Sequence, residues 1–151
     1  IVEAVVAVNT AQKNRMVVKV QEALGGSVTD KTIAVLGLTF KPETDDMRDA
    51  PSLTILPALL KQGAKIKAHD PHGMDEARKE LPDAVEYTDN IDNTVRDADA
   101  IVLMTEWNQY RGLDLEKVKS LMRGNVFVDL RNVYERKLMQ AHGFQYSCVG
   151  R

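Results

Sequence analysis

Three cations in the sequence have neighbours that suit them to bind an anionic ligand. Lys41 stands between Phe40 and Pro42 in a loop that follows an apolar run. Arg48 lies further along the same loop, and Arg131 follows a second apolar run. An ammonium group binds a phosphate as a point charge, whereas a guanidinium offers a planar fork that fits two oxygens. Because Phe40 could stack on a base, these residue types fit a nucleotide ligand.

A purely structural explanation of the same cations stays open. The loop that carries Lys41 and Arg48 also contains four carboxylates, at Glu43, Asp45, Asp46 and Asp49. Arg131 in turn lies close in sequence to Asp129 and Glu135. Exposed ion pairs of this kind contribute under about 1 kcal/mol each. The loop at 37–51 is about twice as long as an ordinary strand–helix connection, which favours a functional role.

The loop also lacks the glycines of a dinucleotide-binding turn. Such a turn carries Gly-x-Gly-x-x-Gly, so that bare backbone can approach a pyrophosphate. Here Gly37 is the only glycine between residues 37 and 51. Side chains rather than backbone would therefore have to hold the ligand.

The hydrophobic pattern predicts the scaffold for these residues. Residues 32–38 form a near-continuous apolar run, which is typical of a buried parallel strand. The expected strands cover 32–38, 64–69, 85–87, 100–104, 125–130 and 144–149, and the expected helices cover 53–61, 74–81, 91–96, 115–122 and 135–142. This alternation predicts an α/β, doubly wound, mostly parallel Rossmann-like sheet of about six strands. Ligands bind such sheets at the carboxyl ends of the strands, where the candidate cations lie.

A long helix is expected before the first strand. Residues 2–24 contain no Gly or Pro, their apolar residues recur near helical spacing, and Gly25-Gly26 supplies a stop signal. The start at Ile1, without Met and within the pattern, suggests a fragment. The first residues are apolar on most sides, so we expect them to pack on a segment absent from this sequence or on a second copy of it.

The composition of the chain indicates which binding partners and which cellular compartment to expect. The chain has 20 basic and 22 acidic residues and a net charge of −2, without the basic excess of a nucleic-acid-binding domain. No apolar run approaches the roughly 20 residues that cross a bilayer, and no signal peptide is recognisable. One cysteine, Cys148, excludes an internal disulfide and fits a reducing compartment. We therefore expect a cytoplasmic protein that binds neither nucleic acid nor membrane.

Other polar residues have weaker patterns. His69 and His72 lack the additional ligands of a zinc site, so no metal is expected. Asp70 is expected to end its strand or cap the next helix, although a ribose contact is an alternative. Trp107 is expected to anchor the packing, and Cys148 to be a buried, unreactive thiol.

Four segments, taken in order, resemble one enzyme family. They are Gly37-Leu-Thr-Phe-Lys-Pro-x-Thr-Asp-Asp-Met-Arg-Asp-Ala-Pro-Ser52, Asp70-Pro71, Thr105-Glu106-Trp107 and Asp129-x-Arg-Asn132. Together they are similar to the C-terminal, UDP-binding domain of the UDP-glucose/GDP-mannose dehydrogenase family, across essentially the whole chain. The last two segments resemble its UDP-glucose 6-dehydrogenase branch. Val8–Lys13 resembles the end of the family's long central helix.

The resemblance implies roles for single residues. It places Phe40 and Lys41 against the UDP-sugar, with the lysine near the phosphates, and Arg131 on the substrate from the other side of the cleft. It assigns Arg48 to NAD, held mainly by an N-terminal domain that this sequence does not contain. The family usually has glycine where Leu130 stands, so we expect the leucine to crowd that turn.

The resemblance also implies which parts the chain contains and which reaction the whole enzyme catalyses. Residues 1–25 would belong to the central helix, on which the family forms homodimers, and residues 26–151 would form the UDP-sugar-binding domain. The family's catalytic cysteine lies in a Gly-x-Cys-x-Pro-Lys-Asp segment, absent here, so no catalytic residue is expected and the chain alone should be inactive. The whole enzyme would oxidise UDP-glucose to UDP-glucuronate with two NAD. The alternatives are a GDP-mannose or UDP-N-acetylmannosamine dehydrogenase, or a free-standing nucleotide-binding regulatory module.

Overall fold

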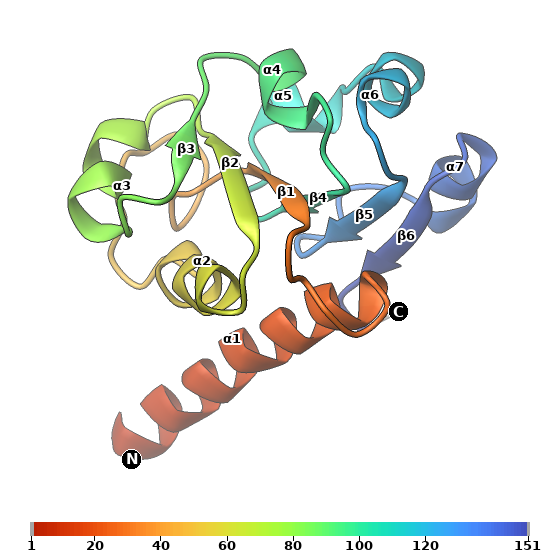
Figure 1. Ribbon diagram of the computed structural model, residues 1–151. Helices are drawn as coiled ribbons and strands as arrows, with labels where there is room; N and C mark the ends of the chain where they lie inside the picture. The colour runs from red at the N-terminus through yellow and green to blue at the C-terminus, as the bar shows by residue number, and fades with distance from the viewer. Residues whose placement is uncertain (1, 151) are drawn as a thin grey trace.

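Six strands form one parallel sheet at the centre of the molecule (Figure 1). The computed structural model describes the backbone of residues 2–150 and the side chains of residues 11–150. The strands are β1 (Thr32–Leu36), β2 (Lys65–His69), β3 (Glu86–Tyr87), β4 (Ala100–Leu103), β5 (Val126–Asp129) and β6 (Gln145–Cys148). Their order is β3-β2-β1-β4-β5-β6. The prediction of a doubly wound, Rossmann-like α/β fold is confirmed.

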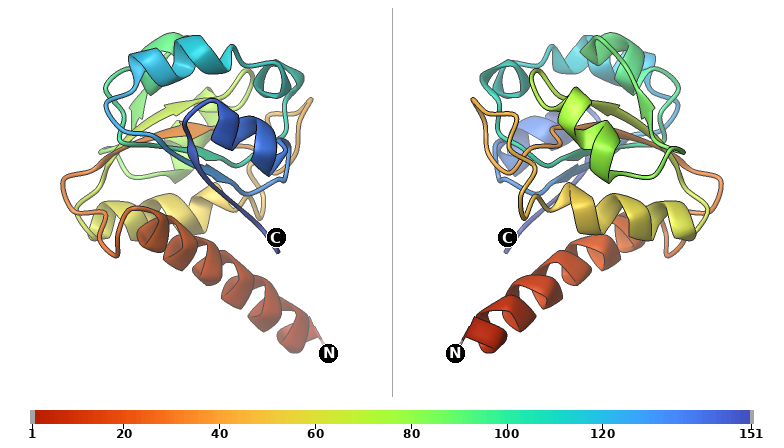
Figure 2. Two further views of the ribbon diagram at one scale, coloured as in Figure 1. Left: turned by 90° about the vertical axis from the view of Figure 1, so that its right-hand side faces the viewer. Right: turned by 90° about the vertical axis from the view of Figure 1, so that its left-hand side faces the viewer.

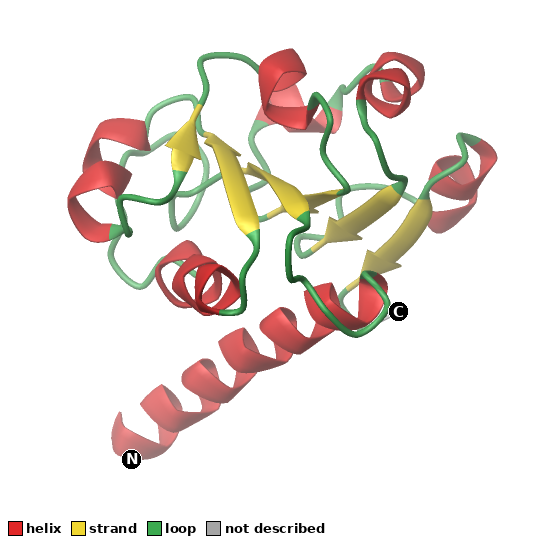
Figure 3. Ribbon diagram, in the orientation of Figure 1, coloured by secondary structure: helices red, strands yellow, loops and turns green. Residues whose placement is uncertain are grey.

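Helices cover both faces of this sheet (Figure 3). They are α1 (Val2–Ala23), α2 (Ser52–Lys61), α3 (Met74–Glu80), α4 (Ile91–Val95), α5 (Asn108–Arg111), α6 (Leu115–Leu121) and α7 (Arg136–Ala141). One hydrophobic cluster joins α1, α2 and α3 to one face, and a second joins α4, α5, α6 and α7 to the other. Alternate residues of β1 enter the two clusters, since Ile33 and Val35 pack in the first and Ala34 and Leu36 in the second. Burial on both faces explains why β1 is apolar along its length.

The short helix α5 was not expected. The sequence between 104 and 115 shows no helical periodicity, because a single turn is too short to display it. Tyr110 holds this turn in place, since its ring is fully buried in the second cluster. Tertiary packing rather than local pattern therefore specifies α5.

The long first helix is confirmed, and its two ends differ in their surroundings. Near the C-terminal end, Val17, Val20 and Ala23 are buried in the first cluster. The N-terminal end projects away from the sheet (Figure 2). The expectation that the first, apolar residues pack on an absent segment or on a second copy of the chain concerns side chains outside the described residues.

The strand order reverses between β1 and β4. From β1 the chain adds β2 and β3 on one side, and from β4 it adds β5 and β6 on the other. The last residues of β1, β4 and β5 lie in register, with Leu36 beside Leu103 and Leu103 beside Asp129. The loops that follow these three strands therefore leave the sheet together, at the point where open α/β sheets bind ligands.

Candidate functional site

The loops after β1 and β4 are in direct contact. Gly37 has a φ of +95°, and a Cβ built on it would lie 2.5 Å from the Cβ of Thr105. The hydroxyl of Thr105 donates a 2.8 Å hydrogen bond to the carbonyl of Thr39. Glycine is required at position 37 both for its backbone conformation and for the space that it leaves. The close approach brings the loop with Phe40 and Lys41 against the end of β4.

A buried carboxylate holds the loop after β1 in place from its other side. Asp70 is fully buried, and its Oδ2 accepts from the backbone N–H groups of Leu38, at 2.7 Å, and Thr39, at 3.1 Å. Its Oδ1 accepts from the N–H groups of His72, at 2.9 Å, and Gly73, at 2.7 Å. Asp70 thus ties the loop after β1 to the turn after β2.

This arrangement confirms one prediction for Asp70, that it ends its strand, and corrects the other two. The residue does follow the last residue of β2, but the N-cap of α3 is Gly73, with no side-chain capping hydrogen bond. A ribose contact is equally incompatible with the structure, because the side chain is fully buried and both its oxygens accept protein N–H groups. The position of Asp70 at a strand end was predictable from the sequence. Its hydrogen-bond partners were not, because they become its neighbours only in the folded chain.

Phe40 and Lys41 occupy the free surface of the anchored loop. Phe40 is 49% exposed, and of the side chains that the structure describes only Val18 and Leu138 are other large hydrophobic groups with such exposure. Lys41 is exposed, and within the described part of the chain it forms no ion pair. The alternative in which Lys41 pairs with a carboxylate of its own loop is therefore not what the structure contains. An exposed aromatic ring and an unpaired ammonium group are available to a ligand.

Arg131 lies in the loop after β5, on the opposite side of the C-terminal end of β4 from the loop after β1. Its N–H donates to Oδ1 of Asp129 at 3.1 Å, and the buried Asp129 also accepts from the hydroxyl of Tyr146 at 2.7 Å. Its guanidinium pairs with Glu106, and not with Asp129 or Glu135, the partners that the purely structural alternative offered. The Arg131 side chain is 42% exposed, so it remains accessible to a ligand.

Leucine at position 130 is accommodated without crowding. Leu130 is 5% exposed and belongs to the first hydrophobic cluster. Its N–H donates to the carbonyl of Leu103 at 3.0 Å, which extends the pairing of β4 and β5 by one bond. The expected disturbance of the turn is therefore wrong, because the side chain points into a core that has room for it.

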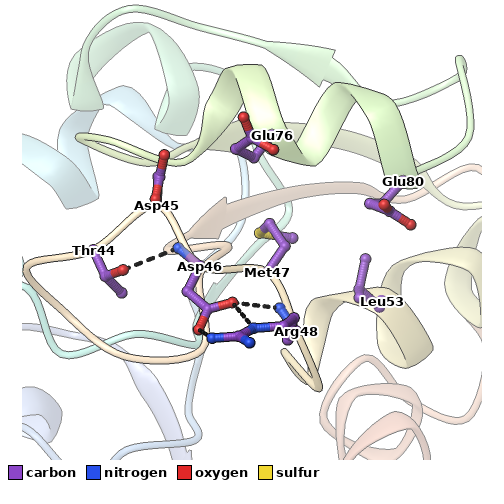
Figure 4. Close-up of a pocket in the computed structure, with 8 residues that line it drawn as sticks. All are labelled: Thr44, Asp45, Asp46, Met47, Arg48, Leu53, Glu76 and Glu80. Carbon is purple, nitrogen blue, oxygen red and sulfur yellow. Dashed lines mark hydrogen bonds and ion pairs between the residues drawn. The ribbon is translucent and has the colours of Figure 1, made fainter.

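Arg48 belongs to a different part of the same loop. Its Nε and Nη2 bind the two carboxylate oxygens of Asp46 at 3.1 and 3.0 Å, although the side chain is 89% exposed (Figure 4). These hydrogen bonds hold the pKa of Asp46 below its usual value. For Arg48, the structural alternative of an ion pair within the loop is confirmed.

A cavity of about 660 Å³ adjoins Arg48. It is lined by Thr44, Asp45, Asp46, Met47, Arg48, Leu53, Glu76 and Glu80 (Figure 4). Its four carboxylates outnumber the single guanidinium, and neither Lys41 nor Arg131 lines it. The charge therefore makes this cavity a poor site for a diphosphate.

Residues 34–136 match the UDP-binding domain of the UDP-glucose/GDP-mannose dehydrogenase family. The chain belongs to this family. The UDP-glucose 6-dehydrogenase of Rhizobium meliloti (strain 1021) is 45% identical over 151 residues, covering 100% of the chain and 34% of that protein. TuaD, a UDP-glucose 6-dehydrogenase of Bacillus subtilis (strain 168), is 40% identical over 100% of the chain and 32% of its own length. The chain thus spans about a third of these relatives.

Solved structures of family members have the same fold. An NDP-N-acetyl-D-galactosaminuronic acid dehydrogenase from Methanosarcina mazei Go1 superposes with a TM-score of 0.77 at 33% identity, over 94% of this chain and 29% of that one. A UDP-glucose dehydrogenase from Pyrobaculum islandicum gives a TM-score of 0.72 at 33% identity, over 91% and 29% of the two chains. Similarity in sequence and similarity in fold therefore support the same family assignment.

In this UDP-binding domain, the remaining polar candidates have structural partners. His69 Nδ1 lies 2.7 Å from the hydroxyl of Tyr110, and burial lowers the pKa of its imidazole. His72 stacks on Trp107 with centroids 5.0 Å apart, and Trp107 is 3% exposed, as expected of a packing anchor. Cys148 is buried, as predicted. Among the described residues, no group of three or more His, Cys, Asp or Glu side chains could hold a metal ion.

The sequence singles out Thr105 and Glu106 only as part of a segment that resembles the family, and it assigns neither of them a role in the site. Thr105 and Glu106 lie two and three residues after Leu103, the last residue of the buried strand β4, as polar residues near a ligand-binding strand end would. That position was the available signal, but it does not reveal that Thr105 contacts the loop after β1 or that Glu106 pairs with Arg131. Both contacts join the loops that carry the predicted cations.

Proposed function

We propose that this chain is the UDP-sugar-binding domain of an NAD-dependent UDP-glucose 6-dehydrogenase. The whole enzyme would oxidise UDP-glucose to UDP-glucuronate, using two NAD per turnover. The observation that carries the proposal is the linkage of the loops after β1, β4 and β5, which places two accessible cations on either side of one strand end. Similarity to UDP-glucose 6-dehydrogenases along the whole chain supports the choice of substrate.

In this proposal the chain binds the part of the substrate that does not react. Lys41 and Arg131 would bind the diphosphate from its two sides, and Phe40 would stack on the base. Binding energy from a remote group of this kind orients the reacting carbon without touching it. The chain would therefore contribute positioning, and the catalytic cysteine would lie in another part of the whole protein.

The residues of this chain could offer NAD only a peripheral contact. NAD would accept the hydride when bound, yet the loop after β1 lacks the glycine pattern of a dinucleotide site. Arg48 could offer a contact through Nη1, since Asp46 already occupies Nε and Nη2. We propose that another domain binds most of the cofactor and that Arg48 adds a peripheral contact.

We further propose a cytoplasmic homodimer built on residues 1–25. Support for the dimer comes from α1, whose N-terminal end projects away from the sheet (Figure 2). Among the described residues no helix is long and apolar enough to cross a bilayer. Sedimentation of the chain at several concentrations measures the dimer directly.

Replacing Lys41 with alanine should weaken UDP binding about ten-fold or more, because a charge-assisted hydrogen bond to phosphate contributes about 1.5–3 kcal/mol. Isothermal titration calorimetry of the chain with UDP measures this change, and titration with GDP tests the alternative substrate class. Lys61→Ala is the matched control, since it removes the same charge at the far end of α2. Equal UDP affinity for Lys41→Ala and Lys61→Ala would refute the phosphate assignment.

A further inference from the structure

The side chain of Arg131 has a single partner in the described part of the chain, the carboxylate of Glu106. Glu106 accepts from Nε, so the donors on Nη1 and Nη2 remain uncommitted among the described residues. We propose that Glu106 is a positioning residue of the UDP site, which fixes the Arg131 guanidinium through Nε and leaves its terminal nitrogens for the diphosphate. This inference rests on the proposed function and adds to it a residue that does not itself contact the phosphates.

The backbone beneath Arg131 is already rigid. The buried Asp129 accepts from the N–H of Arg131 at 3.1 Å and from the N–H of Tyr134 at 2.9 Å. The next residue, Asn132, exchanges two 2.9 Å hydrogen bonds with the backbone of Val149. The remaining freedom of Arg131 therefore lies in its long side chain, and this is the freedom that Glu106 restricts.

Glu106 is itself held between two anchored residues. Thr105 before it is 1% exposed and donates to the carbonyl of Thr39 at 2.8 Å. Trp107 after it is 3% exposed, and the Glu106 side chain is 18% exposed. The backbone that carries the Glu106 carboxylate is thus anchored on both sides, between the loop of Lys41 and the loop of Arg131. The carboxylate can therefore set the position of one cation relative to the other.

A carboxylate at this position has two opposing effects on an anionic ligand. Holding Arg131 in one orientation reduces the side-chain entropy that the arginine loses on binding. Its negative charge, however, repels the diphosphate and neutralises part of the guanidinium. A neutral acceptor of the same shape would keep the first effect and remove the second. Glutamine at position 106 provides that acceptor, because its Oε1 can still accept from Nε.

The two effects predict different results for two substitutions. Glu106→Gln should bind UDP at least as tightly as the wild type. Glu106→Ala also removes the repulsion but frees the guanidinium, so it should bind UDP about five-fold more weakly than Glu106→Gln, because a free guanidinium loses part of its entropy on binding. Calorimetry with UDP measures both affinities, and thermal unfolding verifies that each variant is folded. Glu116→Ala is the control, since it removes an exposed carboxylate in the first turn of α6. If Glu106→Gln weakens binding as much as Glu106→Ala, the inference is wrong.

A double-mutant cycle with Arg131→Ala separates positioning from a general structural role. If Glu106 acts through Arg131, Glu106→Ala should bind UDP no more weakly than Glu106→Gln once Arg131 is alanine. A similar difference between Glu106→Ala and Glu106→Gln in both backgrounds, or no difference in either, overturns the inference, while UDP binding by the wild type keeps the proposed function intact. Absence of UDP binding by the wild type overturns both. Should Glu106→Ala fail to fold, Glu106→Asp takes its place, since its carboxylate is one methylene shorter.

Discussion

Replacing Asp70 with alanine is expected to lower the free energy of unfolding by about 3–5 kcal/mol, because four backbone N–H groups lose their acceptor. Two of these groups belong to the loop after β1 and two to the turn after β2. Each buried donor left without an acceptor costs about 1–3 kcal/mol, and partial relaxation admits water to some of them. Because the loop with Lys41 depends on this carboxylate, UDP affinity should fall together with stability.

Urea denaturation of the Asp70→Ala variant measures the loss of stability. Asp75→Ala is the matched control, because Asp75 is an exposed carboxylate in the first turn of α3. Asp70→Asn should give an intermediate loss, since an amide retains one acceptor oxygen and can hold the loop or the turn but not both. Equal unfolding free energies for Asp70→Ala and Asp75→Ala would show that the buried carboxylate does not organise the loop.

Substitution of Gly37 by alanine should destabilise the fold by about 3 kcal/mol or more. The added Cβ would lie 2.5 Å from Cβ and 2.6 Å from the backbone nitrogen of Thr105, so the loops after β1 and β4 would have to separate. The positive φ of +95° adds a conformational cost of about 1 kcal/mol. Separation of these loops would also shift Lys41 relative to Glu106 and Arg131.

Gly25→Ala isolates the conformational part of this cost. Gly25 has a similar φ of +86°, but no atom lies within 4 Å of the Cβ that alanine would add. The difference between the unfolding free energies of Gly37→Ala and Gly25→Ala therefore measures the steric contact with Thr105. If both variants lose the same small amount, the close contact between the two loops is not present in solution.

The sheet was predictable from sequence because burial on both faces makes its strands continuous apolar runs. In β4 and β5 every residue is buried, and both strands were found with ends within two residues of those observed. The single turn of α5 was missed, since its place depends on Tyr110 packing against residues distant in sequence. The hydrophobic pattern of the sequence thus identifies helices and strands that bury a whole face. It does not identify an element such as α5, which one buried side chain holds in place.

The partners of the site residues were less predictable than their positions. Phe40, Lys41 and Arg131 were correctly placed at strand ends, yet the partner of Arg131 was sought among near neighbours in sequence. Glu106 lies 25 residues away and becomes adjacent only because β4 and β5 pair in the sheet. Similarly, Asp70 was expected to end its strand or to cap the following helix, whereas its Oδ2 accepts from residues 31 and 32 positions earlier. Such contacts are set by the register of the sheet, which the sequence pattern does not contain.

The central claim is that the loops after β1 and β5 form one anion site. Titration of the isotopically labelled chain with UDP, followed by amide chemical shifts, tests it most directly. We expect the signals of Phe40, Lys41, Arg131 and Asn132 to shift along curves that give the same Kd. Shifts confined to one of the two loops, or different Kd values for the two, would contradict a shared site.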